Sequence, residues 1–321
     1  MNILVLGCGK IGSRHVQSLA ESKHGLQLYA VDNSNASLEK VQKIFNNVPS
    51  KNMETNLIAT KDISKIKDKI DIVIIASNSK ERSKLIKSVI NNFNPMHIIL
   101  EKVLFNKISD YKKFEELFNQ INTKVWVNQY MGYEFSFLSK YFGSNEKFKM
   151  KVSGNWGLCC NSVHFIEIFH HLCNRAPLNL KEYSFSDDYI KSKREGYYEL
   201  FGTIKIASSL NSELILECEP SVPENVINID ATSDSHELKD VWVDEHHNCV
   251  IKNGNKSSSD RYYVRRQSER TLEIIESLIR NDYCKLPSYN YSSYHHLLIL
   301  NLFKKKFNEL GVDIKEGIPI T

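Results

Sequence analysis

The first thirty-two residues constrain the fold more than any other part of this 321-residue chain. An apolar, β-branched run at Asn2–Leu6 leads into the segment 7–12, which reads GCGKIG, and a helical pattern follows. A second apolar run, 26–31, ends at Asp32, twenty residues after Gly12. This order predicts a strand, a tight turn, a helix and a second strand with an acid at its tip.

Each residue type in this turn has a role in binding a dinucleotide. Gly7 permits the tight turn, Gly9 lets the backbone approach a pyrophosphate, and Gly12 lets the helix lie close to the strand. The free amides and the positive end of the helix dipole then face the phosphates. Asp32 can accept hydrogen bonds from the ribose hydroxyls. The whole pattern therefore predicts a dinucleotide site rather than an ordinary glycine turn.

The residues around Asp32 favour NAD over NADP. NADP carries a phosphate on the ribose 2′-oxygen, which Asp32 would repel, and NADP sites usually place an arginine nearby. Asn33, Ser34 and Asn35 follow Asp32 and include no cation. We therefore expect NAD as the cofactor.

Size and composition set the broad class of the protein. A chain of this length exceeds what one core usually supports, so two domains are expected. The formal net charge of +4 is small and the lysines are scattered, which disfavours a nucleic-acid partner. No apolar run approaches a membrane span, and because a strand is predicted to begin at residue 2, we expect no signal peptide. Seven cysteines without metal-ligand spacing predict reduced thiols in the cytoplasm and no metal site.

Strand and helix signals alternate over residues 1–127. Such alternation predicts a Rossmann-type α/β domain, a doubly wound parallel sheet with right-handed crossovers. After Asp32 we expect helices at 36–45, 63–70, 83–91 and 111–121, and strands at 57–60, 71–76, 97–100 and 124–127.

The pattern changes over residues 128–321. Here strand signals follow one another without helices between them, which predicts a second, α+β domain with a mainly antiparallel open sheet. We expect strands at 148–156, 198–207, 213–218, 226–231, 238–243 and 249–251, and helices at 135–142, 160–173, 266–280 and 292–309. We assign substrate binding and assembly into a homodimer or homotetramer to this domain, and expect the carboxyl-terminal helix to pack back on the first domain.

Three further segments carry residues suited to chemistry. The fourth strand ends in Ala76–Ser79 and the fifth in Glu101–Val103, at the carboxyl edge where open α/β sheets bind ligands. In the helix expected at 160–173, His164 lies one turn from both Cys160 and Glu167, so these side chains share a face.

At these segments the chain resembles the glucose–fructose oxidoreductase / inositol dehydrogenase / MocA family of dinucleotide-dependent sugar oxidoreductases, over essentially its whole length. The family's Ala-Thr-Pro-Asn and Glu-Lys-Pro strand ends match 76–79 and 101–103, although Val103 replaces the proline. The family's catalytic histidine maps onto His164, with Cys160 in the place of an aspartate four residues upstream. Segments 11–15 and 318–321 are similar to members that act on surface-polysaccharide sugars.

The resemblance implies a role for each of these residues. Lys102 is expected beside the nicotinamide and the reacting hydroxyl, and His164 suits a general acid/base because its ordinary pKa is near working pH. The alternatives are an exposed lysine at a strand end and a packed histidine. Cys160 cannot hold an imidazole as an aspartate does, and Asn161 can hydrogen-bond substrate but cannot take a proton. The predicted cofactor-binding residues are Gly7, Gly9, Lys10, Ile11, Gly12, Asp32, Asn33, Ser77, Asn78, Glu101 and Lys102; the predicted substrate-binding residues are Lys102, Cys160, Asn161 and His164.

The leading hypothesis is an NAD-dependent sugar dehydrogenase or reductase. It would move a hydride between nicotinamide and a hydroxyl or keto carbon of a sugar derivative. The resemblance points to a nucleotide-activated or acidic sugar used for surface glycans. Two alternatives remain open: a redox-neutral epimerase or lyase that oxidises its substrate transiently, and a non-catalytic protein that senses NAD or a sugar.

Overall fold

The computed structural model describes residues 1–142, 146–192, 194–241, 243, 246–253 and 259–321, and it divides the chain into two compact units. The first unit comprises Met1–Asn128 and the returning segment Arg265–Tyr291. The second comprises Gln129–Val264 and Ser292–Thr321. The first unit thus contains the predicted amino-terminal domain together with a segment that lies far along the sequence.

A six-stranded sheet, all of whose neighbours pair in parallel, forms the centre of the first unit. Its strand order, β3-β2-β1-β4-β5-β6, confirms the predicted Rossmann-type fold. Ile72–Ile75 is fully buried, as expected for a central strand that is covered on both faces. The bounds are β1 Asn2–Leu6, β2 Gln27–Val31, β3 Asn56–Thr60, β4 Ile72–Ile75, β5 His97–Leu100 and β6 Lys124–Val127.

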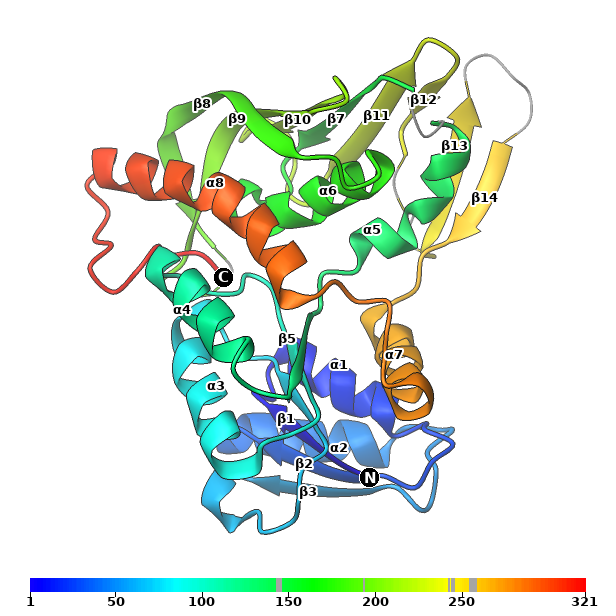
Figure 1. Ribbon diagram of the computed structural model, residues 1–321, viewed down its shortest axis with the longest axis vertical. Coiled ribbons are helices and arrows are strands. Elements are labelled where there is room, and N and C mark those ends of the chain that lie inside the picture. The colour runs from blue at the N-terminus through cyan, green and yellow to red at the C-terminus, as the bar shows by residue number, and fades with distance from the viewer. Residues whose placement is uncertain (143–145, 193, 242, 244–245, 254–258) are drawn as a thin grey trace. The chain divides into compact units, whose positions relative to one another are not determined.

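Helices cover both faces of this sheet (Figure 1). One group comprises α1 Lys10–Leu19, α2 Asn35–Asn46 and α7 Gln267–Asn281; the other comprises α3 Ser79–Phe93 and α4 Ile108–Phe118. The returning helix α7 packs on α1, where the Leu272 amide donates to Ser18 Oγ at 2.9 Å.

Two predicted elements of the first unit differ from the structure. α3 begins four residues early because the Asn78 side chain caps it, accepting a hydrogen bond from the Glu81 amide at 3.0 Å. The helix predicted at 63–70 is wrong: one 3₁₀ turn, Ile63–Lys65, is present. Of the apolar residues after this turn, Ile66 and Ile70 are buried and exposed lysines surround them, so a longer helix would have had a narrow apolar face.

The second unit is built on an eight-stranded sheet of order β14-β13-β12-β11-β7-β10-β9-β8. Its neighbours are antiparallel except β7 and β10, which are parallel, so the predicted mainly antiparallel sheet is confirmed. The bounds are β7 Phe148–Gly154, β8 Leu178–Lys191, β9 Tyr198–Ser208, β10 Glu213–Cys218, β11 Ile227–Ser233, β12 Glu237–Lys239, β13 Asn248–Asn253 and β14 Ser259–Tyr263.

Helix α6, Leu158–Leu172, covers one face of this sheet with side chains that include Phe165, Ile166 and Phe169. The helix predicted at 135–142 is instead a short helix α5, Met131–Glu134, followed by a 3₁₀ segment, Ser136–Lys140. Helix α8 spans Tyr289–Glu309. In the described part of the chain, no helix combines the length and apolar character that crossing a membrane requires.

Candidate functional site

The glycine-rich turn between β1 and α1 has the geometry that the sequence predicts. Gly7 has a φ of 90°, and a Cβ there would lie 3.0 Å from backbone atoms of Ala76 and Ser77. A Cβ at Gly12 would lie 1.8 Å from the Gly7 carbonyl oxygen, so this helix position excludes any side chain. A Cβ at Gly9, by contrast, would meet no atom within 4 Å. The backbone is therefore open to an incoming group at Gly9, as a pyrophosphate requires.

Helix α1 begins at Lys10, directly beside this open backbone. Its first residues, Lys10 and Ile11, follow an N-terminal cap, Gly9, that has no side chain to bond the helix amides. The first amides of a helix lack partners within the helix, and the dipole adds partial positive charge at this end. The turn thus fits an anionic group such as the pyrophosphate of NAD.

Asp32 lies at the tip of β2 and is fixed by two backbone amides. Its Oδ2 accepts a hydrogen bond from Cys8 at 2.7 Å, and its Oδ1 accepts one from Ser34 at 2.8 Å. The first bond ties the carboxylate to the glycine turn, while Asn33 beside it is exposed. Burial, with a smaller contribution from the Asp32 charge, raises the pKa of the Cys8 thiol to about 12. Asp32 is half-buried and is held at the edge where a ribose would bind.

The ends of β4 and β5 carry the next predicted contacts. Ser77 and Asn78 follow β4, and the Asn78 side chain serves as the α3 cap. Lys102 follows β5 and is half-buried. The peptide bond between Lys102 and Val103 is cis, although residue 103 is not a proline.

Glu101 lies inside the first unit, within a buried polar network. Its Oε1 accepts a hydrogen bond from Asn128 Nδ2 and is 3.0 Å from His15 Nε2, and His15 Nδ1 is 2.9 Å from Thr271 Oγ1. Burial raises the pKa of Glu101, but the hydrogen bonds from His15 and Asn128 and the charge of Arg82 outweigh it, so the net pKa is below its ordinary value. Glu101 is therefore an ionised internal group directly before Lys102.

In the second unit, helix α6 carries the predicted histidine. His164 is half-buried, and its ring centroid is 5.8 Å from that of Tyr130. One turn earlier, Cys160 places its Sγ 3.7 Å from the Gly157 carbonyl oxygen. The Asn161 side-chain nitrogen donates to the Trp156 carbonyl at 2.5 Å, so this group is engaged by the backbone.

A carboxylate that the sequence analysis missed lies at the start of α6. Glu199, on β9, accepts hydrogen bonds at one oxygen from the amides of Cys159, at 2.7 Å, and Cys160, at 3.4 Å. The side chain is buried, and it supplies negative charge to the positive end of the helix. The sequence indicates this role of Glu199 only by placing an acid inside an apolar strand. It does not show that the amides of Cys159 and Cys160 are the partners of Glu199.

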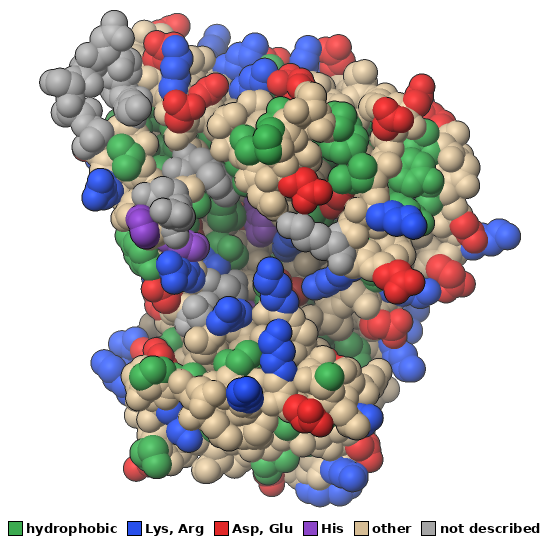
Figure 2. Space-filling model, turned by 180° about the vertical axis from the view of Figure 1, so that it is seen from behind, with side chains coloured by type: hydrophobic (Ala, Val, Ile, Leu, Met, Phe, Trp, Pro, Cys, Tyr) green, Lys and Arg blue, Asp and Glu red, His purple; other side chains and the backbone are tan. Residues whose placement is uncertain are grey.

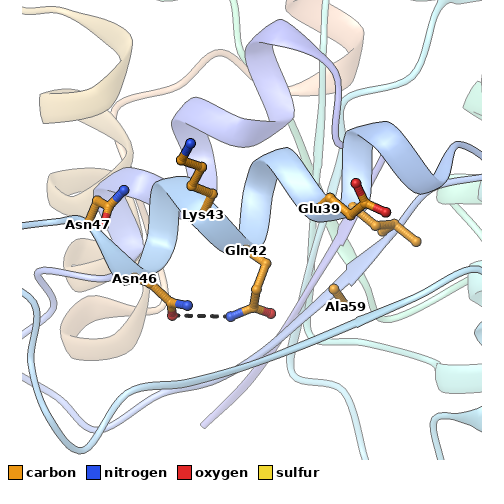
Figure 3. Close-up of a pocket in the computed structure, with 7 residues that line it drawn as sticks. Glu39, Gln42, Lys43, Asn46, Asn47 and Ala59 are labelled. Carbon is orange, nitrogen blue, oxygen red and sulfur yellow. Dashed lines mark hydrogen bonds between the residues drawn. The ribbon is translucent and has the colours of Figure 1, made fainter.

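Other features of the described residues do not add to this site. A groove between α2 and β3 contains none of the predicted site residues. On the α2 side of this groove, Gln42 Nε2 donates a hydrogen bond to Asn46 Oδ1, one turn later in the same helix, at 3.2 Å (Figure 3). Its lining residues are Leu38, Glu39, Gln42, Lys43, Asn46, Asn47 and Ala59. Among the described residues, no cluster of three histidine, cysteine or acidic side chains is placed to hold a metal ion. Acidic and basic side chains are interspersed on the face that Figure 2 shows.

The fold and the site of the first unit define a dinucleotide-binding protein of the Rossmann class. Residues 1–129 match the family model GFO_IDH_MocA, described as an oxidoreductase family with an NAD-binding Rossmann fold. The match covers the amino-terminal domain, less than half of the chain, and describes it as an NAD-binding Rossmann domain, which confirms the predicted cofactor. A search of curated proteins finds no significant match.

Solved structures share the fold along nearly the whole chain. An oxidoreductase from Agrobacterium radiobacter, crystallised with NAD⁺, L-tartaric acid and magnesium, is 13% identical, with a TM-score of 0.70 over 97% of this chain and 98% of that one. The dehydrogenase MviM from Clostridium difficile is 12% identical, with a TM-score of 0.70 over 95% and 99%. The transcriptional regulator Gal80p from Kluyveromyces lactis is 13% identical, with a TM-score of 0.68 over 96% and 92%. At these identities the likeness shows the fold alone.

Proposed function

We propose that this protein is an NAD-dependent oxidoreductase that acts on a hydroxyl or keto carbon of a sugar derivative. The observation that carries the proposal is the glycine turn, with open backbone at Gly9 and Asp32 fixed beside it. The family model, which describes oxidoreductases, supports it for residues 1–129. Localisation in the cytoplasm, proposed from the reduced cysteines, is part of the same proposal.

The chemistry divides between the cofactor and two side chains. When bound, NAD supplies a hydride acceptor for the carbon that carries the hydroxyl. His164 accepts the hydroxyl proton as the carbonyl forms, and the Lys102 ammonium orients the oxygen by hydrogen bonding. In the reverse direction, His164 would give its proton to the carbonyl oxygen as the hydride returns to the carbon, so that the hydroxyl forms. Loss of a positioned acid/base group typically costs about 10²–10⁴-fold in rate, which sets the expected effect of replacing His164.

We propose a nucleotide-activated or acidic sugar, used for surface glycans, as the substrate. Two observations support this class: the similarity of segments 11–15 and 318–321 to members that act on such sugars, and the L-tartaric acid bound to the Agrobacterium oxidoreductase. Tartaric acid is itself a hydroxylated acid. We assign substrate contacts to Cys160 and Asn161 as well as to Lys102 and His164.

A binding-and-absorbance screen tests the proposal. The purified protein is mixed with NAD or NADH and a panel of nucleotide sugars and acidic keto-sugars, and the nicotinamide absorbance is followed. Turnover with one substrate, lost in both Lys102→Ala and His164→Ala, supports the assignment. Lys107→Ala is the matched control, because Lys107 is an exposed lysine a few residues after Lys102 and caps no helix with its side chain. A product formed without net absorbance change would instead indicate the redox-neutral epimerase or lyase.

The second candidate function is a sensor of NAD or a sugar without catalysis. Cys160 favours it, since a thiol replaces the family's aspartate, and the fold likeness to the regulator Gal80p gives a precedent for the class. Tight NAD binding without turnover of any sugar, unchanged by His164→Ala, would favour the sensor over the enzyme.

A further inference from the structure

Arg82 is a buried charge in the third helix of the first unit. It lies in α3 with 1% of its surface exposed, although its sequence neighbours Lys80 and Glu81 and the nearby Lys84 are charged and polar. Burying a guanidinium is costly unless its donors are bonded and its charge is matched. The groups that Arg82 contacts should therefore indicate what this buried charge does.

The guanidinium of Arg82 connects the loop that follows β4 with the loop that follows β5. Nη1 donates to the carbonyl oxygens of Val103 and Leu104, the latter at 2.8 Å, and Nη2 donates to the carbonyl oxygen of Ser77. One planar group therefore bridges the chain after β4 to the chain after β5. The charge of Arg82 also contributes to lowering the pKa of the buried Glu101 carboxyl, directly before Lys102. These two loops carry Ser77, Asn78 and Lys102, which are predicted to contact cofactor and substrate.

We propose that Arg82 is a positioning residue that fixes the spacing between the Ser77–Asn78 loop and the Lys102–Leu104 loop. The inference deepens the proposed oxidoreductase function and rests on it for the roles of those loops. Arg82 acts through backbone carbonyls and touches no reacting atom. Lysine cannot replace it fully, because an ammonium is a compact donor without the fork that reaches two separate chain segments.

Hydrogen exchange of the cofactor-free protein, followed by mass spectrometry, tests the bridge directly. In Arg82→Gln, amides in segments 76–79 and 102–106 should exchange faster together, while strands β1 and β4 remain protected. Arg82→Lys keeps the buried positive charge, so it serves as the second variant in case Arg82→Gln does not fold. In Arg82→Lys, one of the two segments should exchange faster, because an ammonium cannot bond both loops. Arg270→Gln is the matched control: Arg270 is also buried in the first unit, but it donates to the Arg265 carbonyl next to its own helix.

Ligand binding and kinetics then separate positioning from general stability. We expect NAD affinity to fall about tenfold or more in Arg82→Gln, the size expected for loss of charge-assisted hydrogen bonds, and to hold in Arg270→Gln. With an active sugar, kcat should fall more than the sugar KM changes, and added guanidinium should restore part of kcat. Unchanged exchange at either loop in Arg82→Gln, or faster exchange with unchanged NAD affinity, overturns the role of Arg82. Absence of NAD binding by the unmodified protein overturns the proposed function instead.

Discussion

At the scale of single residues, Asp32 illustrates how one carboxylate serves both the fold and the predicted cofactor. Its hydrogen bonds to the Cys8 and Ser34 amides hold it against the glycine turn, so its geometry is set before any ligand arrives. Such preorganisation lowers the cost of ordering the site on binding. Replacing Asp32 by a residue without a carboxylate would remove both of these hydrogen bonds, together with the acceptors that a bound ribose would use.

Asp32→Ala should weaken NAD binding by about 1.5–3 kcal/mol, the usual contribution of hydrogen bonds to a charged group. Titration calorimetry measures the difference. Asp62→Ala is the control, because Asp62 Oδ1 accepts from the Ser64 amide at 2.9 Å in the same local arrangement, but at the edge strand β3. Equal affinities for the Asp32 variant and the unmodified protein would exclude Asp32 from the cofactor site.

Glu101→Gln should destabilise the first unit at neutral pH by about 1.5–3 kcal/mol, because it removes the charge that strengthens the buried contacts with His15 and Asn128. The folded-state pKa of Glu101 is lowered, so its contribution is present above the ordinary carboxyl pKa and is lost as the pH falls through the folded value. Urea unfolding at pH 7 and in mild acid measures both effects. Glu116→Gln, in an exposed pair with Lys112, should change stability by less than about 1 kcal/mol. A gap between Glu101→Gln and the unmodified protein that widened in acid would contradict this account.

The residues of the glycine turn could be predicted from sequence, whereas the network around Glu101 could not. Gly7, Gly9 and Gly12 act through local backbone geometry, which their spacing encodes. His15 meets Glu101 across 86 residues and Thr271 across 256 residues, so its role depends on tertiary packing. The burial of Arg82 could not be predicted for the same reason, because its charged sequence neighbours indicate an exposed helix surface.

At the scale of elements, periodic and buried segments were predictable and polar edge segments were not. The strands β4, β5 and β6 coincide closely with apolar runs in the sequence, and α6 coincides with a strongly apolar segment. β8 and β14 were not predicted. β8 is an edge strand with mostly exposed residues and two register irregularities against β9, so neither alternation nor burial marks it in the sequence. Its strand structure comes from pairing with β9.

Helices α6 and α8 are linked by a buried histidine pair that should make the second unit sensitive to acid. His170 Nδ1 and His295 Nε2 are 2.8 Å apart, and His295 Nδ1 is 3.0 Å from the side-chain nitrogen of Gln129. Burial is the largest cause that lowers the pKa of both histidines. The folded protein therefore keeps them neutral where an unfolded chain would bind protons.

Stability should accordingly be full above the ordinary histidine pKa of about 6.5 and should decline as the pH falls below it, until the folded-state pKa values are passed. Thermal unfolding between pH 8 and pH 5 measures the slope. His295→Gln should flatten it, whereas His24→Gln, at an exposed site in the first unit, should leave it unchanged. A slope that was identical in His295→Gln would assign the acid sensitivity to other groups, of which the buried His97, whose pKa is also lowered mainly by burial, is the first to examine.

At the scale of the whole molecule, the surface of the second sheet bears on the proposed homodimer or homotetramer. The strand faces that alternate with the α6-facing side chains carry cross-strand ion pairs: Lys149–Glu213 at 3.5 Å, Lys151–Glu217 at 2.7 Å and Lys205–Glu182 at 2.8 Å. All six side chains are partly exposed in the single chain. An interface on this face would therefore be polar and charged rather than a continuous apolar surface, and salt would weaken it.

We propose that the protein forms a homodimer or homotetramer through this charged face at low ionic strength and dissociates in high salt, where charges on the surface are screened over a few ångströms. Light scattering with size-exclusion chromatography gives the mass under both conditions. Lys151→Glu, which places like charge beside Glu217, should shift the low-salt mass towards the monomer, and Lys112→Glu on α4 is the control. A monomer at low salt would contradict the proposed assembly. An oligomer that withstood both high salt and Lys151→Glu would place the interface on another surface.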